Sequence, residues 1–288
     1  MIDDRHLVSL PLIGEHMKLA FTTLSCPDWS LEQAVEAAQR YGYEGIELRL
    51  LDGELLQPDL DEAARRRVRA VCAAAGLPVV CVDTSVKIAQ PDAAARAAQV
   101  RDGLTWLDLA ASWDAPMIRV FGGPPAGTPE TTAQAAAAEC LAPLAERGRA
   151  LGVVVALETH DAFARSGMVR SVLDRLPGPG AGVLWDTLHP YRFGESIAET
   201  LGRIGDQLLH VHLKDGARPA DGGVEWRFTL LGQGDVPIRD ILTALRRASY
   251  SGWLSIEWEK KWHPELAEPE VALPQHAEAL RTYLATLV

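Results

Sequence analysis

The sequence lacks an excess of positive charge, and it lacks any long apolar run. Its 288 residues hold 28 Lys and Arg against 39 Asp and Glu, which gives a formal net charge of −11. An acidic surface repels phosphate backbones and no strong basic patch offsets it, so we expect no nucleic-acid partner. No apolar stretch approaches the roughly 20 residues that span a bilayer, so we expect no membrane partner either.

Closely spaced cysteines are also absent. The four cysteines lie far apart with no CxxC pair: Cys26, Cys72, Cys81 and Cys140. This pattern is typical of reduced core cysteines in a cytosolic protein. The N-terminus carries Asp3, Asp4 and Arg5 and no apolar core like that of a signal peptide, so export is not indicated and a cytoplasmic location is expected.

What the sequence does contain is a regular alternation of short apolar runs and longer amphipathic stretches. The eight apolar runs cover residues 18–25, 45–49, 78–85, 116–122, 152–160, 181–188, 208–215 and 253–259. The helical candidates between them cover residues 29–41, 60–75, 92–112, 130–150, 166–176, 195–204, 237–248 and 268–287. Strict alternation of strand and helix predicts parallel strands joined by crossover helices.

Eight such units predict an α/β fold with a single (β/α)₈ TIM barrel over residues 17–288. A doubly wound sheet is the alternative, but the first turn, 25–29, has no glycine-rich phosphate cradle. Residues 1–16 show no clear period and are interpreted as an N-terminal extension. After the seventh strand, residues 216–234 include an alternating run at 224–229, which predicts a short hairpin insertion over the barrel mouth.

Four successive strands end in residues that bind metals. Glu158, Asp186, His212 and Glu257 follow strands five to eight, where TIM barrels carry their active sites. Since a buried polar group is costly without a partner, we predict that these four side chains bind one divalent ion. Carboxylates plus one imidazole favour Mn²⁺ as the expected ion, with Mg²⁺, Co²⁺ or Zn²⁺ as alternatives. The remaining alternative is a network of core salt bridges.

The strand period of two sorts the polar neighbours of these residues. His160 shares the face of Glu158, whereas Lys214 and Glu259 lie one layer above His212 and Glu257. We predict that His160, Lys214 and Glu259 contact the substrate, with a capping hydrogen bond as the alternative for His160. His210 lies one layer below and is interpreted as a core or supporting histidine. The loop after strand eight offers Trp262, whose ring suits stacking on a sugar, and His263, and we predict that both line the substrate pocket. The alternative is a surface loop in which Trp262 packs on a neighbouring helix or a subunit interface.

Two carboxylates that flank a metal-bound substrate point to proton transfer next to a carbonyl group. A metal on the carbonyl oxygen and the adjacent hydroxyl stabilises a developing enediolate. Glu158 and Glu257 come from strands separated by two others, so they can approach the substrate from different sides. One removes the carbon-bound proton and the other returns it, which makes them the predicted catalytic pair.

Several motifs together resemble the sugar phosphate isomerase/epimerase family of xylose isomerase-like barrels. They are LETH (157–160), WDTLH (185–189), HVHLKDGAR (210–218), LLGQGDVP (230–237) and SIEWE (255–259). The resemblance covers about residues 17–288 and implies the same four ligands and the same acid–base pair. It also implies that His189 and Arg218 bind substrate. The GQG element within 230–237 is interpreted as a turn, not a phosphate loop.

The predicted function is therefore a metal-dependent sugar isomerase or epimerase. The alternative is a metal-dependent dehydratase or lyase of a keto-sugar or keto-cyclitol, because the resembled family also includes inosose and dehydroshikimate dehydratases. Strands three and four offer no His, unlike the trinuclear zinc nucleases that share this barrel, so DNA repair is not expected. The predicted partner is a small carbohydrate or polyol-derived substrate, and the oligomeric state, a homo-oligomer included, stays open.

Overall fold

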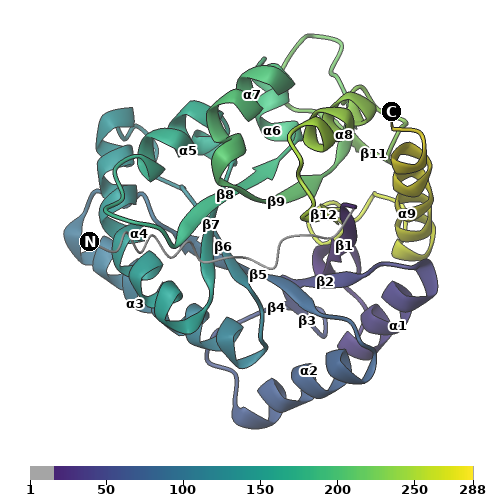
Figure 1. Cartoon of the computed structure of the whole chain (residues 1–288), viewed down its shortest axis with the longest axis horizontal. Coiled ribbons are helices and arrows are strands. Elements are labelled where there is room, and N and C mark those ends of the chain that lie inside the picture. Colours follow the sequence, from purple (N-terminus) through teal and green to yellow (C-terminus); the bar gives the residue numbers. More distant parts are fainter. Residues whose placement is uncertain (1–15, 288) are drawn as a thin grey trace, which may run out of the picture.

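Eight parallel strands close into a barrel in the computed structural model, which describes residues 16–287 (Figure 1). They are β1 (Lys18–Thr22), β2 (Gly45–Leu48), β5 (Val79–Lys87), β6 (Met117–Phe121), β7 (Val154–Glu158), β8 (Ala181–Asp186), β9 (Leu208–Leu213) and β12 (Trp253–Ile256). Around the barrel the order is β1, β12, β9, β8, β7, β6, β5, β2. The predicted TIM barrel is confirmed. The predicted extension, apart from His16, lies outside the described residues.

Helices cover the outside of this barrel (Figure 1). They are α1 (Leu31–Tyr41), α2 (Glu62–Ala74), α3 (Ala93–Ser112), α4 (Glu130–Leu151), α5 (Ser166–Leu173), α6 (Leu188–Arg192), α7 (Ile197–Ile204), α8 (Ile238–Arg247) and α9 (Pro269–Ala285). All eight helical candidates are confirmed, and α6 is a short addition that the periodicity did not predict. Helix α1 begins in a capping box between Ser30 and Gln33 and ends at Gly42, whose φ of 73° favours glycine.

The alternation of side chains along each strand places the polar residues at one end of the barrel. The barrel interior is apolar further from the carboxyl ends of the strands. There, one residue from each of four adjacent strands packs against the others: Cys81, Met117, Ala156 and Leu184. Two positions further along the same strands, the same inward-facing rows continue with polar residues: Asp83, Arg119, Glu158 and Asp186. The apolar layer therefore supports a polar site at the carboxyl end of the strands.

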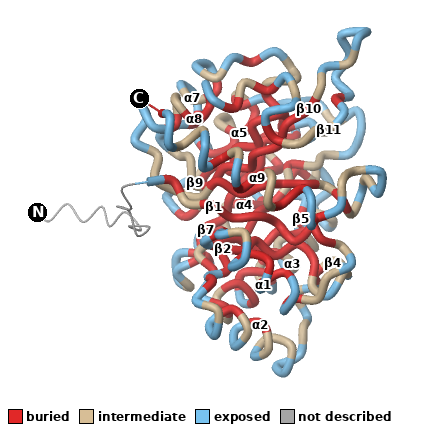
Figure 2. Tube along the Cα trace, turned by 90° about the vertical axis from the view of Figure 1, so that its right-hand side faces the viewer, coloured by how far each residue is buried: buried red, intermediate tan, exposed pale blue. Residues whose placement is uncertain are grey.

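The core between strands and helices is built from the apolar helix faces. Helix α8 shows the pattern, since Ile238, Ile241, Leu242 and Leu245 are all buried. Figure 2 shows the strands as the buried centre, with exposed residues along the outer helices and the loops. The four cysteines are buried and unpaired, as predicted. Among the described residues, no helix combines the length and apolar character needed to cross a membrane.

Two small antiparallel pairs sit outside the barrel. One joins β3 (Leu50–Leu51) to β4 (Glu54–Leu55), and the other joins β10 (Asp215–Ala217) to β11 (Arg227–Thr229). The short hairpin insertion predicted within residues 216–234 is not confirmed in that form, because only the last three residues of the alternating run 224–229 form a strand. Their partner is the segment directly after β9, so the pair grows out of the barrel strand itself.

Asp215 holds the chain that returns from β11 to α8. Its carboxylate accepts hydrogen bonds from the backbone N–H groups of Gly216, Gly232, Gly234 and Val236, at 2.8–3.1 Å. A Cβ atom at Gly234 would lie 2.3 Å from Oδ1 of Asp215, so only glycine fits there. The GQG element is thus wrapped around a buried carboxylate of this chain.

Candidate metal centre and active site

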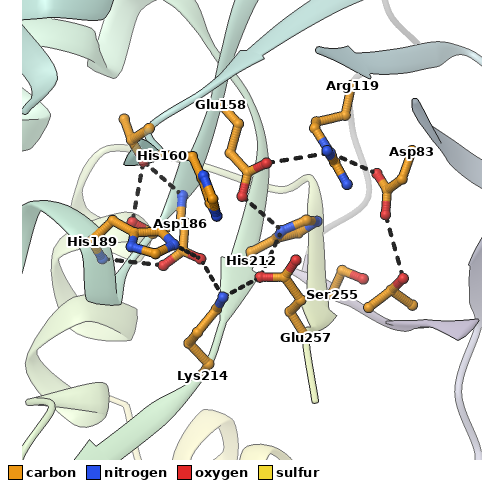
Figure 3. Close-up of polar contacts among 12 residues, drawn as sticks. Asp83, Arg119, Glu158, His160, Asp186, His189, His212, Lys214, Ser255 and Glu257 are labelled. Atoms are coloured by element: carbon orange, nitrogen blue, oxygen red, sulfur yellow. Dashed lines mark hydrogen bonds and ion pairs between the residues drawn. The ribbon is translucent and has the colours of Figure 1, made fainter. Parts of the chain in front are cut away.

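Four side chains from adjacent strands converge at the carboxyl end of the barrel (Figure 3). Glu158 ends β7, Asp186 ends β8, His212 lies on β9 and Glu257 directly follows β12. The strand register sets Asp186 beside His212 and aligns His212 with Ser255, two residues before Glu257. One potential ligand atom from each of the four lies within 4.8 Å of the other three.

The chemistry of these atoms fits a divalent cation. Oε1 of Glu158, Oδ2 of Asp186, Nδ1 of His212 and Oε2 of Glu257 are buried, and among the described residues only two of them, Oδ2 and Oε2, have a cationic partner, Lys214. Clustered buried acceptors of this kind are costly with a single ammonium beside them, whereas one divalent cation would satisfy all four at once. The set contains no thiolate, which favours an ion that accepts oxygen and imidazole ligands. The four residues thus form a candidate metal site.

Lys214 lies inside this ring of carboxylates. Its Nζ is 2.9 Å from Oδ2 of Asp186 and 2.5 Å from Oε1 of Glu259, and it also contacts Glu257. Burial disfavours the charged ammonium, but the charges of Asp186 and Glu257 outweigh it and hold the pKa of Lys214 well above its usual value. The predicted substrate contact is therefore a buried cation that also balances the ligand charges.

Glu47, on β2, supports His212 from behind. Its Oε1 lies 2.9 Å from Nε2 of His212, its Oε2 lies 3.3 Å from Nε2 of His210, and Ser255 donates a hydrogen bond to it. A carboxylate on Nε2 fixes the tautomer that leaves the Nδ1 lone pair free for a metal. Sequence reasoning missed Glu47, although a lone carboxylate inside the apolar run 45–49 was a signal.

Arg119, on β6, anchors Glu158. Its Nε lies 3.2 Å from Oε2 of Glu158 and 3.3 Å from Oδ1 of Asp83, a residue of β5. Burial raises the pKa of Glu158, but Arg119 together with His212 and His160 outweighs it, so the pKa lies below the usual value. Both Arg119 and Asp83 were missed, and a buried charge within an apolar strand was again the available signal.

The two histidines of the LETH and WDTLH motifs form one wall above Asp186. His189 is buried with Nε2 3.3 Å from Oδ2 of Asp186, and its ring meets that of His160 edge-on with centroids 4.4 Å apart. Burial and the charge of Lys214 hold the pKa of His189 well below its usual value, so its imidazole is neutral. His160 is a quarter exposed, with Nδ1 3.1 Å from Oδ1 of Asp161. Their contact with substrate stays a prediction.

The remaining predicted substrate residues lie further out. Glu259 touches Lys214, and His263 follows it with Nε2 3.9 Å from Oε2 of Glu259. The structure does not bring Arg218 into this cluster, since its side chain is exposed with the guanidinium 5.1 Å from the ring centroid of Trp226. Trp262 is 48% exposed. Substrate binding by these four residues also stays a prediction.

Trp262 offers a direct test of the loop between β12 and α9. We expect Trp262→Ala to leave metal content and folding nearly intact, because the side chain is largely exposed. It should raise KM or change substrate preference, since it removes binding surface and no proton-transfer group. Steady-state kinetics and metal analysis would check this. Unchanged kinetics would return the side chain to a surface role, and altered assembly with normal chemistry would place it in an interface.

Known proteins with similar sequences include an epimerase and a dehydratase. Fructoselysine 3-epimerase of Escherichia coli O157:H7 is 23% identical over 283 residues, covering 93% of this chain and 98% of that protein. Inosose dehydratase of Clostridium botulinum (strain Eklund 17B / Type B) is 33% identical over 100 residues, 30% of this chain and 33% of that protein.

Among solved structures, the IolI protein with a zinc atom superimposes with a TM-score of 0.81 at 17% identity. The alignment covers 94% of this chain and 99% of that one. This likeness supports the barrel fold. Residues 35–283 also match the sequence model of a protein family, the xylose isomerase-like TIM barrel. The chain therefore belongs to the xylose isomerase-like TIM barrel family.

Proposed function

We propose that this protein is a divalent-metal-dependent sugar isomerase or epimerase that moves a proton next to a carbonyl group. The observation that carries the proposal is the convergence of four buried ligand atoms within 4.8 Å of one another, with the two glutamates on the outer strands of the four. The similarity to fructoselysine 3-epimerase over 93% of the chain supports a sugar substrate. Mn²⁺ is the proposed ion.

In each of the two glutamates, Glu158 and Glu257, one carboxylate oxygen faces the other metal-binding side chains and one does not. When bound, a divalent ion supplies the positive charge that polarises the substrate carbonyl. In Glu257, Oε2 faces His212 and Lys214, which leaves Oε1 to accept or donate the substrate proton. In Glu158, Oε1 faces His212 while Oε2 is paired with Arg119.

In the proposed reaction the two glutamates act on opposite faces of the reacting carbon. Between β7 and β12 in the barrel order lie β8 and β9, so the substrate carbon is held between two bases. One glutamate removes the proton, and the other, protonated, returns a proton to the opposite face. The Lys214 ammonium, in contact with Asp186 and Glu257, can donate a hydrogen bond to a substrate oxygen.

Incubation of the Mn²⁺-loaded protein with a panel of ketoses in D₂O tests this reaction. We expect deuterium at the carbon next to the carbonyl in the product, without loss of water, because the returned proton comes from solvent. Mass spectrometry and NMR of the sugars would measure it. Absence of deuterium across a broad panel of free ketoses, substituted ketoses and keto-cyclitols would contradict the proposal.

Dehydration is the second candidate, favoured by the match to inosose dehydratase over 100 residues. The same proton abstraction allows a hydroxyl group on the next carbon to leave as water: one glutamate keeps the carbon-bound proton, and the other, protonated, donates its proton to the departing hydroxyl. A new enone chromophore in the same incubations, with loss of one water from the product mass, would favour this outcome over epimerisation.

A further inference from the structure

A groove of about 450 Å³ beside the candidate metal centre has no part in the chemistry proposed above. It runs between β11 and the loop that joins β12 to α9, both at the mouth of the barrel. Aromatic, aliphatic and polar side chains line it, among them Phe228, Leu230, Gln233, His263, Glu265 and Leu266. Such a mixed lining suits an organic group better than bulk water.

Only the side chain of Lys214 separates Phe228, at one end of the groove, from the metal-binding residue Asp186. Phe228 has its ring centroid 5.5 Å from Nζ of Lys214, and that ammonium is 2.9 Å from Oδ2 of Asp186. On the other side, His263 has Nε2 3.9 Å from Oε2 of Glu259, which also contacts Lys214. Lys214 and Glu259 thus stand between the reacting carbon and the groove.

Both walls of the groove are held in place by internal contacts. The rings of Phe228 and His263 meet edge-on with centroids 5.0 Å apart. The buried ammonium of Lys260 donates to the carbonyl groups of Pro264 and Leu266, at 2.7 Å each, which fixes the loop. Trp258 donates from Nε1 to the carbonyl of Ala267 at 3.0 Å. The groove is therefore formed before any substrate arrives, so little ordering cost opposes binding.

We propose that the groove binds a substituent carried by the substrate sugar, so that the substrate class is a sugar conjugate and not a free ketose. This inference rests on the function proposed above and specifies its substrate. The ring of Phe228 is only half-buried, and a free sugar held between Glu158 and Glu257 beside Lys214 would leave the groove unfilled. A conjugate covers that ring and the Leu266 side chain, and its burial adds affinity.

Three probes distinguish the kind of substituent. They are D-fructose, D-fructose with a benzylamino group at carbon 1, and D-fructose joined at carbon 1 to the amino group of an amino acid. Calorimetric titration of the Mn²⁺-loaded protein gives each affinity, and deuterium exchange in D₂O gives reactivity. We expect at least one conjugate to bind about tenfold tighter than D-fructose, as a buried aromatic or aliphatic contact of about 1.4 kcal/mol provides.

Variants locate that preference in the groove. Phe228→Ala should lower the ratio of conjugate to D-fructose affinity about fivefold, because it removes the stacking surface. Gln233→Trp fills the groove from an exposed position and should lower the ratio in the same way. Val271→Ala removes an exposed apolar side chain of α9, which is not among the groove residues, and should leave the ratio unchanged.

The outcomes separate the groove from the reaction. Equal affinity for all three probes, no binding by any of them, or a preference that survives both groove variants would overturn the groove assignment. Tighter conjugate binding without deuterium exchange would support the groove and contradict the proposed reaction. Exchange with D-fructose and no preference for either conjugate would support the reaction and contradict the groove.

Discussion

The protein loaded with Mn²⁺ should hold close to one divalent ion per chain, and His212→Ala should lose that ion. The reason is the donor set, since His212 supplies the single nitrogen among three carboxylates and lies between Glu158 and Glu257, 3.6 and 3.4 Å from their nearest oxygens. Without it, three carboxylates and the Lys214 ammonium remain, and the ammonium competes for the same oxygens. Elemental analysis after dialysis and gel filtration would measure the stoichiometry.

A substitution of Glu47, which contacts Nε2 of His212, provides a control with an intermediate effect. Glu47→Gln keeps all four ligands but weakens the hydrogen bond to Nε2 of His212, so metal affinity should fall about 10- to 100-fold without being abolished. His16→Ala removes an exposed histidine outside the site and should retain the full ion content. Full occupancy in His212→Ala would contradict the assignment of the ligands.

The sequence predicted the barrel because strand and helix periods are local properties that the fold preserves. Each apolar run became a strand, and the residues that end four of them meet at the same end, as parallel strands require. The ligand candidates could be found because a Glu, Asp or His at the end of a buried strand stands out. Their motif neighbours strengthened that prediction by resemblance.

The supporting residues were harder to find because their roles depend on contacts between strands distant in sequence. Glu47 and His212 are 165 residues apart, and the 2.9 Å contact between them exists only once the barrel closes. Arg119 likewise acquires a role only when β6 pairs with β7 and its guanidinium reaches Glu158. The pairing of β10 with β11 was missed for a similar reason. Asp215 of β10 accepts a hydrogen bond from Gly232, which lies beyond β11, and this contact forms only in the folded chain.

Glu158→Gln and Glu257→Gln should each slow the interconversion of the two epimers by a factor of about 10²–10⁴. A carboxamide keeps the size of the side chain and one oxygen ligand, but it cannot accept a proton. Each variant should still exchange deuterium into the one epimer whose proton faces the surviving glutamate, because removal from that side needs only that base. NMR of each epimer incubated separately in D₂O, at saturating Mn²⁺ and with the metal content measured, would show this asymmetry.

The asymmetry separates proton transfer from metal binding. Glu47→Gln disturbs the site through His212 and touches neither face of the substrate, so its losses should be equal for the two epimers. If weakened metal binding alone explained the glutamine variants, they would show the same symmetric loss, and saturating Mn²⁺ would restore both directions. Loss of exchange with both epimers in each glutamine variant, despite bound metal, would contradict the two-base assignment. Opposite preferences in the two variants would instead assign one face of the reacting carbon to Glu158 and the other to Glu257.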